Sequence, residues 1–273
     1  MLSLHRVIDG DLSAGDALPG VYSTFEKHDI RFYRSALHMT AGRPGGGKSI
    51  LALDHALKCK VPSLYLSCDM SRFQFAARAA AILTGDSAGS VKEIIKTAQG
   101  REKYRAALKG ADHLYMAFEK RPDQDCLEDI LLAFEERWGI PPELIVVDNA
   151  INLVPPTAKD EWSGLREISH LLEWFADELG SAVHLLHHTN LPGLKLDRPG
   201  PLNSIKGQIV EGASLILSVT KTDDEFRVTA VKNRNGPEDP TAQQFLTLSL
   251  SGALSLSDPP PTPVLPAQFH DWA

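Results

Sequence analysis

The stretch Gly42-Arg-Pro-Gly-Gly-Gly-Lys48-Ser49 decides the fold. It fits the pattern G-x-x-x-x-G-K-[ST] and lies between an apolar run and a helical pattern that begins at Lys48. In such a loop, backbone N–H groups surround phosphate oxygens, Lys48 reaches the β- and γ-phosphates, and Ser49 ligates Mg²⁺. A glycine-rich turn that binds nothing would not require Lys and Ser after the last glycine. The sequence therefore predicts an ATP-binding loop formed by Gly42, Arg43, Pro44, Gly45, Gly46, Gly47, Lys48 and Ser49.

Apolar runs that favour strands alternate with helical patterns around this loop. Glu143-Leu-Ile-Val-Val-Asp148 is typical of a strand buried on both faces of a parallel sheet. Between Ser163 and Leu179, apolar residues recur every three or four positions, which predicts an amphipathic helix. Further strands are expected at 35–40, 63–67, 182–187, 214–219, 226–232 and 245–250, the last two as an antiparallel hairpin. These patterns predict an α/β fold, a mostly parallel twisted sheet flanked by helices with an antiparallel β-hairpin edge.

The chain of 273 residues has room for one large domain or two small ones. Residues 1–35 show no sustained period, so we expect an irregular N-terminal arm there. The ATPase domain is expected over 36–257. Residues 258–273 begin with a stretch in which five of nine residues are proline, which predicts a disordered tail or, alternatively, a partner-binding peptide.

Composition excludes several classes of protein. With 43% hydrophobic and 23% charged residues, the chain has the composition of an ordinary globular protein. No apolar run approaches the ~18 residues of a membrane span, and the first residues lack the layout of a signal peptide. Three scattered cysteines do not form a disulfide framework or a metal motif. We therefore expect a cytoplasmic protein that does not contact membranes.

The charge is unevenly distributed. A net charge of −7 has the wrong sign for a protein that coats nucleic acid. However, residues 92–121 carry eight basic and four acidic side chains, whereas residues 122–180 carry three basic and fourteen acidic ones. A local basic surface that binds DNA is therefore compatible with the negative net charge of the chain.

Two aspartates are candidates for catalysis beside the loop. Asp148 ends an apolar strand, where ATPases with such a loop place a carboxylate that holds Mg²⁺. The alternative is an Asp that caps a turn and binds no metal. Asp69 follows the strand at 63–67 and should reach the same edge of a parallel sheet. It can orient the attacking water, or it can be the N-cap of the next helix. We expect Ser49 and Asp148 to ligate the metal and Asp69 to act on water.

Several stretches together resemble the RecA-like ATPase domain of the DnaB-type replicative helicases, including compact phage and plasmid forms. The loop preceded by Ala41 is similar to the family's A-R-P-G-x-G-K-[ST], and Ser67-Cys-Asp-Met-Ser71 to its S-L-E-M-S. Leu144-Ile-Val-Val-Asp148 matches the Walker B strand, and His184-Leu-Leu-His-His188-Thr-Asn190 stands where the family ends a strand in a polar sensor. Lys232-Asn-Arg234-Asn-Gly-Pro237 is similar to its K-x-R-N-G-P hairpin. The resemblance spans about residues 20–250 and implies a RecA-like P-loop NTPase core, in a form without the family's N-terminal helical domain.

The resemblance also implies residue roles. The family's catalytic Glu falls on Asp69, a departure that shortens the side chain by one methylene, and its sensor falls on His188, or on His187 after a shift of one residue. The family's Lys and Arg that reach the neighbouring subunit's ATP fall on Lys232 and Arg234. Such a finger stabilises charge on the γ-phosphate and makes the active site a property of an oligomer.

DNA is expected to contact the segment between the sensor strand and the next strand, Thr189 to Gly207. It carries Lys195, Arg198 and Lys206 against one acid, Asp197, and in the family loops here face a central channel. Copies that converge on one axis would create a positive funnel inside an acidic ring. Because no aromatic residue lies in this segment, contacts to the DNA backbone rather than base stacking are expected. A flexible surface loop is the alternative.

The resemblance implies an ATPase and DNA helicase that acts on single-stranded DNA in replication, with ATP and Mg²⁺ bound at the interfaces of a hexameric ring. A loader or primase is a possible partner of such a ring. Two alternatives remain open. One is a RecA- or KaiC-like filament or regulatory ATPase, and the other is a nucleotide-switched DNA-binding or loading factor in which Asp69 marks slow hydrolysis.

Overall fold

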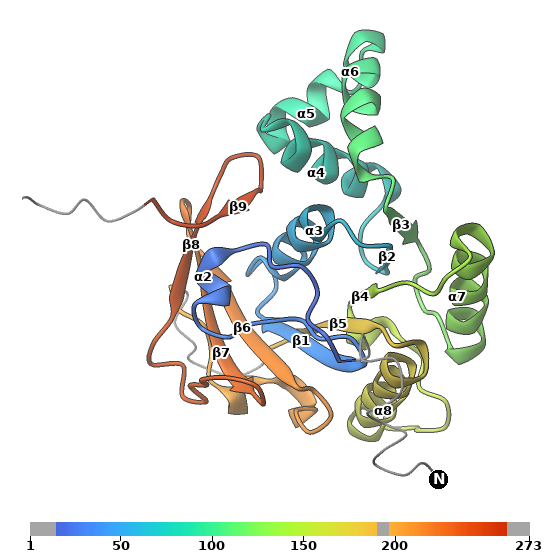
Figure 1. Cartoon of the computed structure of the whole chain (residues 1–273), viewed down its shortest axis with the longest axis vertical. Helices are drawn as coiled ribbons and strands as arrows, with labels where there is room; N and C mark the ends of the chain where they lie inside the picture. The colour runs from blue at the N-terminus through green and yellow to red at the C-terminus, as the bar shows by residue number, and fades with distance from the viewer. Residues whose placement is uncertain (1–14, 190–196, 261–273) are drawn as a thin grey trace, which may run out of the picture.

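A single twisted sheet organises the computed structural model, which describes residues 15–189 and 197–260. In this part of the chain the strands lie in the order β3-β2-β4-β5-β1-β6-β7-β8-β9 (Figure 1). Their bounds are β1 Ala36–Gly42, β2 Ser63–Ser67, β3 Leu114–Ala117, β4 Leu144–Asp148, β5 Ala182–His188, β6 Leu215–Lys221, β7 Glu225–Asn233, β8 Leu246–Leu250 and β9 Leu256–Ser257. From β3 to β6 the strands are parallel, and from β6 to β9 they are antiparallel. The predicted α/β class and antiparallel edge are confirmed.

The register of the parallel strands brings their carboxyl ends to one edge of the sheet. Ser67 of β2 lies opposite Asp148 of β4, and Gly42 of β1 lies opposite His188 of β5. Polar residues that end these strands are therefore neighbours in space, although they are far apart in the sequence. We call this edge the carboxyl rim.

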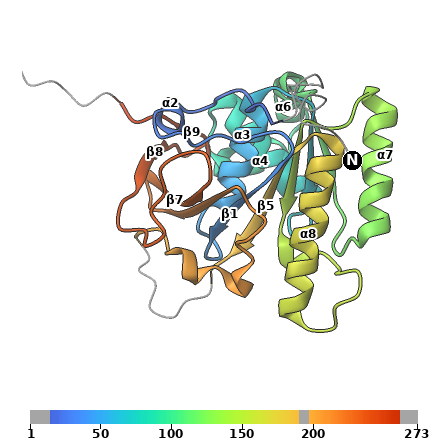
Figure 2. The ribbon, with the colours of Figure 1, turned by 60° about the horizontal axis from the view of Figure 1, so that its bottom comes forward.

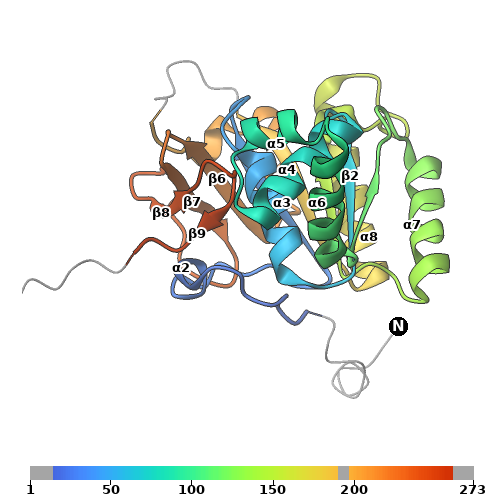
Figure 3. The same ribbon diagram turned by 90° about the horizontal axis from the view of Figure 1, so that it is seen from above.

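Helices cover both faces of the sheet (Figures 2 and 3). One face carries α3 (Lys48–Cys59) and α4 (Arg72–Thr84), beyond which α5 (Ala88–Ile94) and α6 (Ala98–Leu108) pack on α4. The other face carries α7 (Gln124–Trp138) and α8 (Glu161–Leu179). One-turn helices are α2 (Ser23–Glu26), η1 (Lys109–Ala111), η2 (Ala150–Asn152), η3 (Leu202–Ser204) and η4 (Lys206–Gln208). The basic stretch 92–121 thus lies mainly in α5, α6 and η1, and the acidic stretch 122–180 includes α7 and α8.

The two faces of the central strands supply two apolar cores. In β4, Leu144 and Val146 belong to the core beneath α3, whereas Ile145 and Val147 belong to the core beneath α8. This alternation explains why the strand reads as an unbroken apolar run. Each such side chain contributes about 1.5 to 3 kcal/mol when it is fully buried. The rim is consequently held by a rigid central sheet.

Residues 15–35 are part of the domain and not a separate irregular arm. Leu18, Tyr22, Phe25, Ile30 and Phe32 are buried in the core beneath α3. The sequence shows no period there because α2 is a single turn and the rest is turns and irregular chain with one isolated β-bridge, between Ala17 and Tyr33. The expectation of an arm is therefore corrected for the described residues 15–35.

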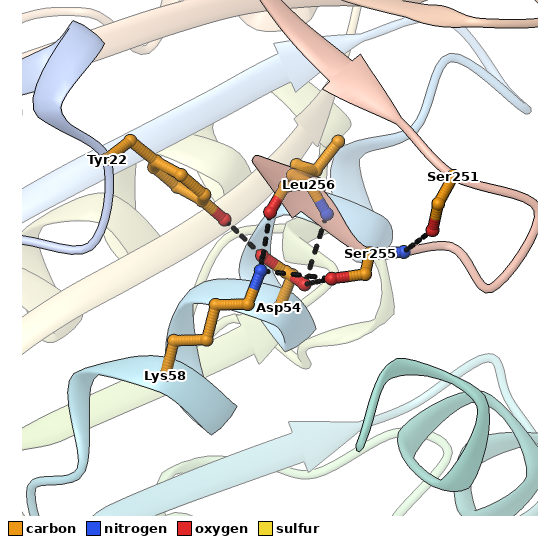
Figure 4. A network of polar contacts seen from close by, with 6 residues as sticks. All are labelled: Tyr22, Asp54, Lys58, Ser251, Ser255 and Leu256. Carbon is orange, nitrogen blue, oxygen red and sulfur yellow. Dashed lines mark hydrogen bonds and ion pairs between the residues drawn. The ribbon is translucent and has the colours of Figure 1, made fainter. Parts of the chain in front are cut away.

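Asp54 of α3 connects both ends of the described chain to this helix (Figure 4). Its buried carboxylate accepts hydrogen bonds from Tyr22 Oη at 2.5 Å, Ser255 Oγ at 3.0 Å and Leu256 N at 3.2 Å, and pairs with Lys58 at 2.8 Å. The segment before β1 and strand β9 are thereby fixed to the helix that begins at Lys48.

Asp258, at the start of the proline-rich stretch, also bonds to the N-terminal segment. Its carboxylate accepts from the backbone N–H groups of Ser23 at 2.9 Å and Thr24 at 2.7 Å. Although burial raises the pKa of Asp258, these bonds lower it to about 2 overall. The rest of the predicted disordered tail, 261–273, lies outside the described residues. Within the described ranges, no helix is long and apolar enough to cross a membrane.

Candidate nucleotide-binding site

The loop between β1 and α3 has the backbone of a phosphate cradle. Gly45 and Gly47 have φ of 74° and 98°, a region that side chains other than glycine rarely adopt. A Cβ added at Gly47 would lie 2.5 Å from Cε2 of Phe226 in β7. Gly47 is also the N-cap of α3, so the positive end of that helix opens into the loop.

Lys48 is folded over the loop. Its Nζ donates to the carbonyl oxygens of Gly42 at 2.9 Å and Arg43 at 3.1 Å, and lies 3.4 Å from Nδ1 of His188. Burial lowers the pKa of Lys48 to about 8, against the opposing effect of Asp148 and Asp69. The ammonium group is thus poorly solvated and held at the place where phosphates are expected.

Asp148 lies at the rim beside Ser49, as the sequence predicts. Its Oδ2 accepts a hydrogen bond from Tyr65 Oη at 2.9 Å, and Ser49 also bonds to the carboxylate. Burial raises the pKa of Asp148, and the bonds from Ser49 and Tyr65 oppose that shift. Carboxylate and hydroxyl oxygens are the ligands that Mg²⁺ prefers, so these residues fit the ion.

Asp69 is held by two amides from the segment after β4. Asn149 Nδ2 donates to its Oδ2 at 2.6 Å, and Asn152 Nδ2 donates to its Oδ1 at 2.9 Å. Asp69 is not the N-cap of α4, because Ser71 occupies that position in a capping box with Gln74. The side chain is instead exposed at the rim and does not cap a helix.

The structure distinguishes His188 from His187. His188 lies beside Lys48, and burial followed by the Lys48 charge lowers the pKa of His188 to about 4. His187 is fully buried on the opposite face of β5, where Nε2 donates to the carbonyl of Lys206 at 2.6 Å. Of the two sensor candidates, only His188 adjoins the loop.

Lys232 and Arg234 lie away from this loop. Lys232 Nζ donates to the carbonyls of Val210 and Glu211, and Arg234 Nη2 donates to that of Glu211 at 2.7 Å. Burial, followed by the charge of Arg234, lowers the pKa of Lys232. Asn233 between them pairs with Leu215 at the start of β6, whereas the loop adjoins the end of that strand. At ~3.3 Å per residue, this separation is on the order of 10 Å or more along β6.

The segment expected to bind DNA is only partly described. Lys195 lies outside the described residues. Arg198 is exposed beside the ring of Phe245, with Cζ 5.9 Å from the ring centroid. Lys206 pairs with Glu161 at the start of α8, so its charge is partly balanced within the chain.

Sequence reasoning missed several residues of the site. Tyr65, Asn149 and Asn152 carry no motif of their own, and their roles depend on contacts between separate segments. Lys221 ends β6, and its Cδ lies 3.5 Å from the place of a Cβ added at Gly47. The available signal for Lys221 was a lysine shortly after the predicted strand 214–219.

The fold and the loop define the chain as a P-loop NTPase. The family model described as an AAA domain (AAA_25) matches residues 31–193, and the chain belongs to this family. It is 34% identical over 249 residues to the gene 65 protein of Mycobacterium phage L5, covering 88% of this chain and 92% of that protein. The gene 65 protein of Mycobacterium phage D29 is 33% identical over 218 residues, covering 77% of this chain and 93% of that protein.

This chain is also similar, at lower sequence identity, to replicative helicases. A probable plasmid replicative DNA helicase of Chlamydia trachomatis is 24% identical over an alignment of 241 residues, covering 81% of this chain and 51% of that protein. A DnaB-like replicative helicase solved in a study of its interactions with primase superposes with a TM-score of 0.77 at 15% identity, covering 94% of this chain and 67% of that one. A second solved structure, that of an ATPase domain, gives a TM-score of 0.75 at 16% identity, covering 94% of this chain and 96% of that one. The predicted RecA-like core of the DnaB type is confirmed as the fold.

Proposed function

We propose that this chain is an ATP-driven motor on single-stranded DNA, a DnaB-like helicase that acts in replication. The observation that carries the proposal is the gathering of Lys48, Asp148, Asp69 and His188 around one loop. A binding loop alone would serve any nucleotide-binding protein, but a candidate base and sensor beside it support hydrolysis. The family membership and the similarity to a plasmid replicative helicase support the same conclusion.

In this proposal the phosphates of ATP lie on the loop, and Lys48 exchanges its bonds to the loop carbonyls for bonds to the β- and γ-phosphates. Ser49 and Asp148 hold Mg²⁺, which supplies charge neutralisation on the phosphates when it is bound. Asp69 orients the attacking water and accepts its proton. His188, which is neutral near pH 7, accepts from Lys48 at Nδ1 and is left with Nε2–H to contact the γ-phosphate.

Lys232 and Arg234 complete the site from a neighbouring copy of the chain. Their distance from the loop of their own chain supports a role in trans, where they would contact the γ-phosphate bound by the next subunit. A hexameric ring provides such an interface at every subunit. DNA would pass through its channel against Lys195, Arg198 and Lys206, with a loader or primase as partner and the cytoplasm as location.

A second candidate is a nucleotide-switched DNA-binding or loading factor with slow hydrolysis. Asp69 favours it, because the shorter side chain has less reach toward water and is tied to Asn149 and Asn152. Turnover separates the two candidates. A RecA- or KaiC-like filament or regulatory ATPase would hydrolyse ATP without separating strands.

The test is ATP hydrolysis by the full chain with and without single-stranded DNA, beside the Lys48→Ala variant. We expect DNA to raise the rate and Lys48→Ala to abolish it. A fully active Lys48→Ala protein would overturn the role of the loop. Wild-type protein that binds ATP and single-stranded DNA but turns over no faster with DNA would favour the loading factor.

A further inference from the structure

Trp162, in the first turn of α8, is 62% exposed beside a hollow of about 280 Å³. The hollow is also lined by Leu165 of α8 and by Asn203, Lys206 and Gly207 of the segment after β5. An indole that leaves most of its surface in water beside a cavity is unusual, because large aromatic residues are on average well buried. The hollow lies just below the ~300 to 1,000 Å³ of pockets for drug-sized ligands, so it has room for one flat ring system.

The two walls of the hollow come from segments that follow neighbouring strands. The segment before α8 follows β4, and the segment with Lys206 follows β5, so both leave the sheet at the carboxyl rim. The walls are in close contact, because a Cβ added at Gly207 would lie 2.8 Å from Cδ1 of Leu165. The hollow is therefore built before any ligand arrives.

The charge beside Trp162 suits a nucleotide whose base is the main contact. Lys206 supplies a cation, but its pairing with Glu161 leaves little net charge for a phosphate. The indole and Leu165 offer apolar surface, and the exposed amide of Asn203 offers a donor and an acceptor for the edge of a base. Among polyanions, single-stranded DNA combines a negative backbone with unpaired flat bases.

We propose that an unpaired base of single-stranded DNA stacks on Trp162 in this hollow. The inference rests on the proposed function and names a contact within it. It also changes the expectation from the sequence, because the aromatic residue comes from α8 and not from the segment 189–207. The backbone carbonyl of Lys206 accepts from His187, which precedes His188. The hollow is thus connected through Lys206 and His187 to His188, the residue that contacts Lys48.

The test is the affinity of the full chain, with a non-hydrolysable ATP analogue, for a fluorescently labelled oligo-dT strand. Trp162→Ala should weaken binding roughly tenfold or more, while Trp162→Phe should restore most of the affinity. Trp174→Ala is the matched control, because Trp174 lies on the same helix, is 48% exposed and does not line the hollow. The control should bind like wild type. A strand with abasic sites should bind wild type and Trp162→Ala equally weakly.

Several outcomes would overturn the stacking contact. Equal affinities of wild type and Trp162→Ala for oligo-dT would do so, as would an equal loss in Trp174→Ala. The Trp162→Ala variant could instead change the oligomeric state and bind DNA as tightly as wild type when both proteins are in the same oligomeric state. That result would identify the indole as a contact between subunits and not with DNA. Wild-type protein that fails to bind oligo-dT at all would overturn the DNA part of the proposed function, a result distinguishable from loss in the variant alone.

Discussion

The side-chain amide of Asn149 donates to Asp69 at 2.6 Å, and Asn149 directly follows Asp148 in the chain. The candidate water-orienting carboxylate and the candidate metal ligand are thereby connected through one residue. Asn152 bonds to the other oxygen of Asp69 at 2.9 Å. With both oxygens held, Asp69 has a defined orientation despite its exposure. The rate of ATP hydrolysis decides whether this fixed orientation serves the attack of water or holds the carboxylate away from it.

Asn152→Ala should therefore slow ATP hydrolysis without weakening ATP binding. The loss of one amide lets the carboxylate rotate, and a misplacement of about 1 Å costs up to ~10²-fold in rate. We expect kcat to fall ten- to a hundredfold, measured with a coupled ATPase assay, while the Kd of a fluorescent ATP analogue stays constant. Asn152→Gln, which keeps the donor, should recover part of the rate. Wild-type kcat in Asn152→Ala would show that the amide has no part in hydrolysis.

Arg234→Ala should bind ATP but lose hydrolysis, because the finger it removes can be worth ~10³ to 10⁵ in rate. Mixing Arg234→Ala with Lys48→Ala should restore some activity, since mixed interfaces combine an intact loop with an intact finger. The readout is the ATPase rate across mixing ratios at constant total protein. Arg105→Ala, which removes an exposed partner of Glu102 on α6, is the control and should keep full activity. Absence of rescue at every ratio would contradict a finger in trans.

The salt dependence of DNA binding should separate the three basic residues of the segment 189–207. Each lost phosphate contact reduces the slope of log K against log salt by about 0.7 for single strands. Lys195→Ala and Arg198→Ala should each flatten the slope, and Lys206→Ala should do so less because Lys206 pairs with Glu161. Basal hydrolysis should remain. An unchanged slope in the triple variant would place the DNA site elsewhere, with residues 92–121 the next region to test.

Motifs with fixed spacing made the positions of the loop, Asp148 and Asp69 at one edge of the sheet predictable, because these positions depend on neighbours in the sequence and on strand ends. The partners of these residues were not predictable in this way. Asn149 and Asn152 meet Asp69 across 80 and 83 positions, and nothing local distinguishes them from asparagines in turns. Similarly, residues 15–35 have no period because they pack as irregular chain with turns and one helical turn. No expected element anticipated α5, α6 or β3, whose packing on α4 and β2 is set by tertiary contacts.

Acid should destabilise the fold through a group of buried histidines. His38, His55 and His184 surround the ring of Phe32, with centroids 4.5 to 5.2 Å from it. Burial lowers the pKa of His38 to about 3 and that of His55 to about 4, and lowers that of His184 well below 6.5. Because the unfolded state takes up these protons first, stability is full above pH 6.5 and is lost as the pH falls toward the folded pKa values. Protonation of His38 and of His55 should each lower the free energy of unfolding by about 2 kcal/mol between pH 7 and pH 5. Urea unfolding at a series of pH values measures this loss.

A pair of variants isolates this effect. His55→Leu removes one buried titrating group, so its free energy of unfolding should depend less steeply on pH between 6.5 and 5. The control is His170→Leu, which removes an exposed histidine on α8. Parallel curves for His55→Leu and wild type would show that His55 is not a source of the acid sensitivity.

Asp54→Ala should destabilise the whole domain, although Asp54 has no catalytic role. The change leaves Tyr22 Oη and the N–H of Leu256 buried without their acceptor and breaks the pair with Lys58 (Figure 4). Breaking a buried pair in this way costs about 3 to 5 kcal/mol, so the urea midpoint should fall markedly. Glu93→Ala, which removes the partner of Lys96 in an exposed pair, should change stability by less than ~1 kcal/mol. An Asp54→Ala protein as stable as wild type would mean that apolar packing and the bonds of Lys58 suffice to fix the two ends of the described chain to α3.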